Sequence, residues 1–62
     1  MQYKVELRQN NETIISKEFE EYDNAYDYSN ELISQIENNI FVVLLELKND
    51  KWVLIRKLSL EN

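Results

Sequence analysis

Residues 40–47, with the sequence IFVVLLEL, are the most apolar stretch of the chain and constrain its fold most strongly. Seven of the eight side chains are apolar, and many are β-branched or aromatic, which is typical of a buried strand. Successive side chains of a strand point to opposite faces, so Ile40 and Phe41 belong to different faces. Because one helix covers only one face of a sheet, this strand needs cover from two sides.

The segments before this stretch indicate two strands followed by a helix. Residues 2–8 alternate apolar and polar side chains, and residues 13–20 form a second predicted strand after an Asn-rich turn. A three-residue loop would pair Leu7 with Ile15, and a two-residue loop would pair it with Ile14. We prefer the first register because it places large apolar pairs on one face. Its other pairs are Val5 with Lys17 and Tyr3 with Phe19.

Residues 21–38 have the period of an amphipathic helix, with Glu21 or Asp23 as the N-terminal cap and Asn38-Asn39 at the exit. Its predicted apolar stripe comprises Tyr22, Ala25, Tyr26, Ser29, Leu32, Ile33 and Ile36. Tyr28 lies about 90° from the centre of this stripe at 3.6 residues per turn, so we expect it to be partly exposed.

Residues 51–58 form the fourth predicted strand, joined to the third by a two-residue turn at Asn49-Asp50. The predicted pairs are Leu47 with Trp52, Glu46 with Val53, Leu45 with Leu54, Leu44 with Ile55, Val43 with Arg56 and Phe41 with Leu58. The order of elements predicts one small α+β domain over residues 1–62. Its fold is β-β-α-β-β, a four-stranded antiparallel sheet in order 2-1-3-4 with one helix packed on one face.

The predicted pairing gives the third strand two different faces. Phe41, Val43, Leu45 and Leu47 line up with Trp52, Leu54 and Leu58, and this larger surface is the better candidate for helix packing. The other face stays open and is the candidate contact for a second copy or a protein partner. It comprises Ile14, Ile40, Val42, Leu44, Val53 and Ile55. The alternative is that strand twist and long Lys and Arg side chains conceal enough of this face in a monomer.

Composition argues against most catalytic and ligand-binding functions. The chain has no histidine or cysteine, which removes the commonest general base, metal ligands and thiolate chemistry. A chain of 62 residues rarely encloses the pocket of about 300 Å³ that small molecules need. We therefore expect no enzymatic activity, no catalytic, cofactor-binding or metal-binding residues and no small-molecule substrate.

No stretch resembles a signal peptide or a membrane span, so we expect a cytoplasmic protein without membrane partners. The abundance of Asn, Ile and Lys and the lack of Gly and Pro favour an AT-rich bacterial or phage gene.

Acidic residues are concentrated in the predicted helix. Residues 18–37 contain seven acidic residues and no basic one. Asp23, Asp27 and Glu31 recur every four residues, opposite the apolar stripe. In the simpler interpretation they form a solvated face that keeps the protein soluble. In the functional interpretation they form a partner-binding row beside Tyr28, because aromatic residues are enriched in binding hot spots.

The sequence therefore predicts a non-enzymatic protein-interaction or regulatory module, expected to be a homodimer, that binds through its apolar sheet face, its acidic helix or both. The alternative is a phage-type inhibitor or nucleic-acid mimic that presents the acidic helix to a basic groove. Direct binding of nucleic acid is disfavoured by the net charge of −5.

Overall fold

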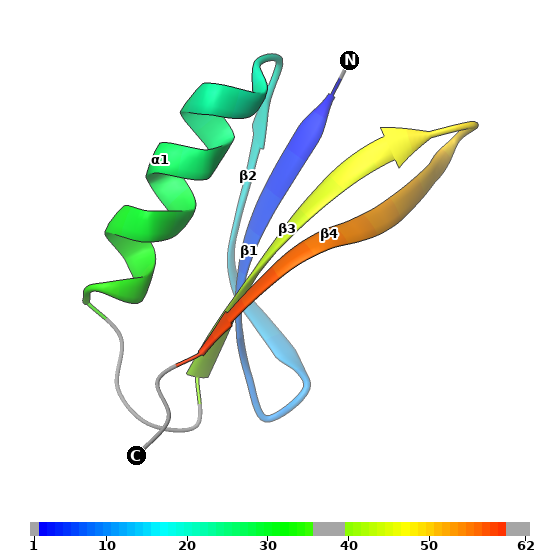
Figure 1. Ribbon diagram of the computed structural model, residues 1–62. Helices are drawn as coiled ribbons and strands as arrows, with labels where there is room; N and C mark the ends of the chain where they lie inside the picture. The colour runs from blue at the N-terminus through cyan, green and yellow to red at the C-terminus, as the bar shows by residue number, and fades with distance from the viewer. Residues whose placement is uncertain (1, 36–39, 60–62) are drawn as a thin grey trace.

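The computed structural model describes residues 2–35 and 40–59. Their elements are β1 (Tyr3–Gln9), β2 (Glu12–Phe19), α1 (Tyr22–Ile33), β3 (Ile40–Lys48) and β4 (Lys51–Ser59). The strands form one antiparallel sheet in the order β2-β1-β3-β4, and α1 lies across one of its faces (Figure 1). The predicted α+β fold, the element order and the strand order are confirmed.

Both hairpins turn through two residues with positive φ. Asn10 and Asn11 have φ angles of 52° and 68°, and Asn49 and Asp50 have φ angles of 50° and 64°. Asn and Asp enter this left-handed region more readily than other non-glycine residues, and two in succession make the turn that matches the twist of paired strands. The predicted turn at Asn49-Asp50 is confirmed, whereas the predicted three-residue loop in the first hairpin is wrong.

The first hairpin has a β-bulge at Ile14. Leu7 faces Ile15 but Arg8 faces Thr13, so Ile14 is an extra residue on β2. This bulge allows a two-residue turn and the predicted register to coexist. The pairs Leu7 with Ile15, Val5 with Lys17 and Tyr3 with Phe19 are therefore confirmed.

The second hairpin has a β-bulge at Ile55. On the turn side of it, the predicted pairs of Leu47 with Trp52, Glu46 with Val53 and Leu45 with Leu54 are confirmed. Beyond it the predicted pairs are wrong, because one extra residue moves every following side chain to the other face. The observed pairs there are Leu44 with Arg56, Val43 with Lys57, Val42 with Leu58 and Phe41 with Ser59.

The helix covers the even-numbered residues of β3. Val5 faces Leu44 and Leu7 faces Val42, and residues directly opposite in antiparallel strands share a face. All four side chains are at most 8% exposed. They pack with Ala25 and Leu32 of α1 as the core cluster.

The prediction that the helix packs on Phe41, Val43, Leu45 and Leu47 is therefore wrong. Ile40, Val42 and Leu44, predicted to lie on the open face, lie on the face covered by α1. The reason is the register between β1 and β3, which aligns the apolar row of β1 with the even-numbered residues of β3. No tight turn joins these two strands, so turn chemistry does not set this register.

Capping residues mark both ends of α1. Glu21, one of the two residues predicted for this position, is the N-cap; its backbone is extended and its side chain accepts no capping hydrogen bond. Ser34 is the C-cap, and its Oγ donates a 2.7 Å hydrogen bond to the Glu31 carbonyl oxygen. The predicted exit at Asn38-Asn39 and the predicted stripe residue Ile36 lie outside the described residues. No helix in the described part of the chain has the length and apolar character needed to cross a membrane.

Candidate functional site

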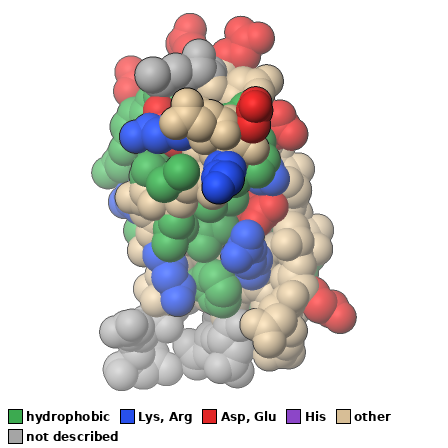
Figure 2. Space-filling model, turned by 90° about the vertical axis from the view of Figure 1, so that its right-hand side faces the viewer, with side chains coloured by type: hydrophobic (Ala, Val, Ile, Leu, Met, Phe, Trp, Pro, Cys, Tyr) green, Lys and Arg blue, Asp and Glu red, His purple; other side chains and the backbone are tan. Residues whose placement is uncertain are grey.

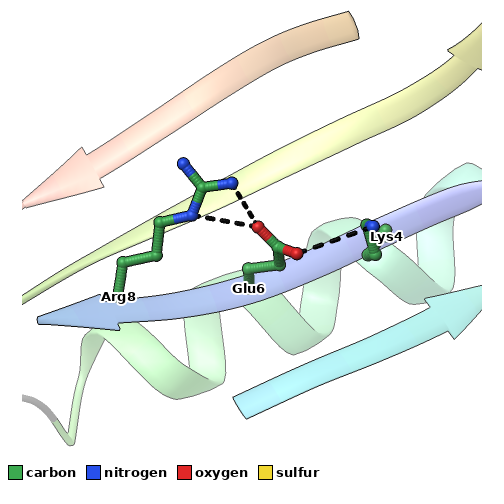
Figure 3. A network of polar contacts seen from close by, with 3 residues as sticks. All are labelled: Lys4, Glu6 and Arg8. Carbon is green, nitrogen blue, oxygen red and sulfur yellow. Dashed lines mark hydrogen bonds and ion pairs between the residues drawn. The ribbon is translucent and has the colours of Figure 1, made fainter. Parts of the chain in front are cut away.

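The sheet face away from α1 carries a charged network along β1. Lys4, Glu6 and Arg8 project from this strand on the side opposite the helix (Figure 3). Glu6 Oε1 accepts a 2.9 Å hydrogen bond from Arg8 Nε and a second, closer one from Arg8 Nη2. Glu6 Oε2 is 3.6 Å from Lys4 Nζ. Glu6 is buried. Two cations of its own strand, Lys4 and Arg8, compensate the charge of its carboxylate.

Lysine side chains also lie over the aromatic rings of this face. Lys4 Nζ is 4.3 Å from the centroid of the Trp52 ring, and Lys57 Nζ is 4.6 Å from that of Phe41. Val43 and Leu45 are only 2% and 8% exposed, and the stems of long basic side chains can cover apolar surface of this kind. Figure 2, which views the molecule from the side opposite α1, shows basic side chains among apolar ones. This face is therefore not a bare apolar surface.

Replacing Glu6 with glutamine is expected to lower the free energy of unfolding by about 1–2 kcal/mol, because Lys4 and Arg8 would then face a neutral group. Urea denaturation followed by circular dichroism measures this change. Glu20→Gln is the matched control, since Glu20 is exposed and forms no ion pair among the described residues. Equal stability of the two variants would show that the network contributes nothing.

The exposed large apolar side chains lie at the edges of the sheet and on one side of α1. They are between 36% and 53% exposed and comprise Ile14 and Ile15 of β2, Val53, Leu54 and Ile55 of β4, and Tyr22 and Tyr26 of α1. Of the predicted contact residues, Ile14, Val53 and Ile55 are thus exposed. They do not form one surface, because β2 and β4 are opposite edges of the sheet.

Arg56 connects β4 to the exposed tyrosines of α1. Its guanidinium carbon lies 4.1 Å from the centroid of the Tyr26 ring, and its Nη1 donates a 3.4 Å hydrogen bond to Ser29 Oγ. Ser29 is fully buried, and its Oγ donates a 2.7 Å hydrogen bond to the Tyr26 carbonyl oxygen. The ring centroids of Tyr22 and Tyr26 are 5.8 Å apart. The guanidinium therefore lies over the Tyr26 ring and is anchored by its hydrogen bond to a buried hydroxyl.

Val53 extends this surface along the edge strand. It faces Glu46, which in turn faces Tyr3, so all three side chains share the face that carries α1. Tyr3 packs edge-on against Tyr22, with ring centroids 5.6 Å apart. We call the exposed surface between the helix and the edge strand the α1–β4 flank. It comprises Tyr22, Tyr26, Val53 and Arg56, and it adjoins the exposed bulge residue Ile55 of β4.

The flank offers hydrogen-bond donors as well as apolar area. Arg56 is half-buried and forms no ion pair with any residue that the structure describes. A guanidinium stacked on a ring keeps its N–H groups in its own plane, where a carboxylate can accept two of them. The flank can therefore accommodate a partner surface that combines apolar side chains with a carboxylate.

The predicted acidic row is present, but Tyr28 does not belong to it. Asp23, Asp27 and Glu31 are exposed, and none forms an ion pair within residues 2–35 and 40–59. Tyr28 is half-buried, as expected from its position, and its ring centroid lies 5.3 Å from that of Phe19. Its packing is with the core rather than with the carboxylates. Binding of a protein or a basic groove by this row stays a prediction.

Sequence reasoning missed the flank as a unit. The sequence predicts Tyr22 and Tyr26 in the core stripe, and it pairs Arg56 with Val43, whereas in the structure Arg56 faces Leu44. The bulge at Ile55 moves Arg56 to the helix side. A weak signal was present, because two apolar residues followed by two basic ones, Leu54 to Lys57, break the alternation of a regular strand.

In the described part of the chain, no three His, Cys, Asp or Glu side chains form a group that could hold a metal ion, and no pocket is detected. Comparisons with family models, curated proteins and solved structures give no match.

Proposed function

We propose that this protein is a non-enzymatic interaction module that binds another protein through the α1–β4 flank. The observation that carries the proposal is the stacked Arg56 between exposed tyrosines and the exposed apolar residues of β4. Tyrosine and arginine are enriched among residues that dominate binding energy, especially where apolar neighbours exclude water around them.

The position of these residues also supports binding through their side chains. Tyr22 and Tyr26 lie on a helix anchored to the core, and Val53 lies on a strand paired with the central strand β3. Such elements hold contact residues in a fixed arrangement, which lowers the entropy lost on binding. The bulge at Ile55 disfavours addition of a further strand at the β4 edge. A partner therefore contacts the flank rather than extending the sheet.

The proposal is tested with two variants that add negative charge at opposite edges of the sheet. Val53→Glu/Ile55→Glu places two charges at the β4 border of the flank, and Ile14→Glu places one on the opposite edge at the other bulge residue. Each immobilised protein is incubated with a lysate of the source cells, and retained proteins are identified by mass spectrometry. Circular dichroism establishes that every variant is folded.

We expect a partner to be retained by the wild-type protein and by Ile14→Glu but not by the flank variant. If the partner is a second copy, the flank variant is monomeric where the wild-type chain and Ile14→Glu associate. A partner that binds all three proteins equally contradicts the proposal. So does a wild-type chain that retains no protein and stays monomeric.

A further inference from the structure

We infer that the partner of the α1–β4 flank is a second copy of this chain, related to the first by a two-fold axis. The inference rests on the proposed function and adds the identity of the partner. Its basis is the distribution of charge, because the flank contains a cation near the sheet and is bordered by carboxylates on the outer side of α1. Arg56 is the cation, and Asp23 and Asp27 are the carboxylates.

Helical geometry gives the order of these groups around α1. At 3.6 residues per turn, Asp23 lies about 60° and Asp27 about 100° from Tyr26 around the helix axis. Measured as an angle around the helix axis, both aspartates lie further from the buried residue Ala25 than Tyr26 does. Arg56 stacks on Tyr26 from β4. The tyrosine ring thus separates the guanidinium from the aspartates of the same copy, and neither charge forms an ion pair with a described residue.

A two-fold contact between two such flanks pairs opposite charges. In an isologous interface the same patch is used twice, so the sheet border of one copy lies against the outer border of the other. Arg56 of each copy then meets the aspartates of its partner, while the tyrosines and Val53 of both copies form the apolar centre. A uniformly acidic partner would attract Arg56 but repel Asp23 and Asp27. A uniformly basic partner would do the reverse.

The required contact is compatible with the size of the protein. Interfaces at the lower end of the standard class bury about 600 Å² of each partner. This is about an eighth of the 4504 Å² accessible surface of the chain. One side of the molecule is enough for such an interface. Because both copies carry a net charge of −5, their overall repulsion opposes association, and we expect a dissociation constant in the micromolar range.

The test uses complementary charge reversal. Arg56→Glu alone and Asp23→Arg/Asp27→Arg alone each place like charges on both sides of the two-fold contact. Each is expected to weaken self-association by at least about tenfold, measured by sedimentation equilibrium from micromolar to millimolar concentration. In an equimolar mixture every altered group meets an opposite charge, so dimers are expected to form again.

Glu31→Arg is the matched control, because Glu31 is an exposed carboxylate of the same helix that lies about 140° from Tyr26 around the axis. It is expected to leave the dissociation constant within about twofold of the wild-type value. A mixture of the charge-reversal variants that stays monomeric while the wild-type chain dimerises overturns the inference. So does a wild-type chain that is monomeric at millimolar concentration. That result leaves the proposed function standing if a different protein is retained by the wild-type chain and lost by Val53→Glu/Ile55→Glu.

Discussion

Replacement of Leu44 with alanine is expected to lower the free energy of unfolding by about 2–5 kcal/mol and to leave much of the protein unfolded at room temperature. Leu44 is 1% exposed and lies under α1, between Val5 of β1 and Arg56 of β4. A single core of this size, without a disulfide, rarely supplies more than about 3–5 kcal/mol. The loss is therefore comparable with the whole stability of the chain.

Leu54→Ala is the matched control for this variant. Leu54 is a leucine of the neighbouring strand β4 in the same sheet, but it is 53% exposed. Truncating a half-exposed side chain removes little buried area, so a change below about 1 kcal/mol is expected. Urea denaturation followed by circular dichroism compares the two. If both substitutions shift the unfolding midpoint equally, α1 does not cover the face of Leu44.

Much of the fold could be predicted because its signals are local. The alternation in residues 2–8, the change of period after Glu20 and the turn at Asn49-Asp50 each indicate an element without reference to the rest of the chain. The central position of β3 followed from its apolar content on both faces. These features gave the strand order 2-1-3-4 that the structure confirms.

The covered face of β3 could not be predicted, because no local signal distinguishes its two faces. A strand with one apolar face has its register fixed by burial of that face. In β3 both Leu44 and Leu45 are apolar and both are buried, one under α1 and the other on the face away from it. The register between β1 and β3 decides between them, and that is a contact between segments distant in sequence.

The candidate site was obscured by a single extra residue. Arg56 stacks on Tyr26 only because the bulge at Ile55 moves it to the helix side of β4. The acidic row needed no such information, since a spacing of four residues places side chains on one side of any helix. The sequence therefore predicts the acidic row, whereas it pairs Arg56 with Val43 instead of Leu44 and so places it on the face opposite Leu44.

Replacement of Ala25 with leucine is expected to lower the free energy of unfolding by about 3 kcal/mol, at the upper end of the usual cost of overpacking. Ala25 is the only alanine of the chain, and both it and Ser29 have no exposed surface. These two small side chains, one helical turn apart, let α1 approach Val5 and Leu44 closely. Three additional carbon atoms have no space there, so the helix must move away from the sheet.

Asn24→Leu is the matched control, because it adds an apolar side chain at the preceding position of the helix, where the residue is exposed. Its stability is expected to stay within about 0.5 kcal/mol of the wild-type value, measured by urea denaturation. Equal stability of the two variants would mean that α1 does not lie as close to the sheet as its buried alanine indicates. Displacement of the helix also separates Tyr26 from Arg56. Ala25→Leu is therefore expected to weaken binding through the α1–β4 flank even under conditions in which the chain stays folded.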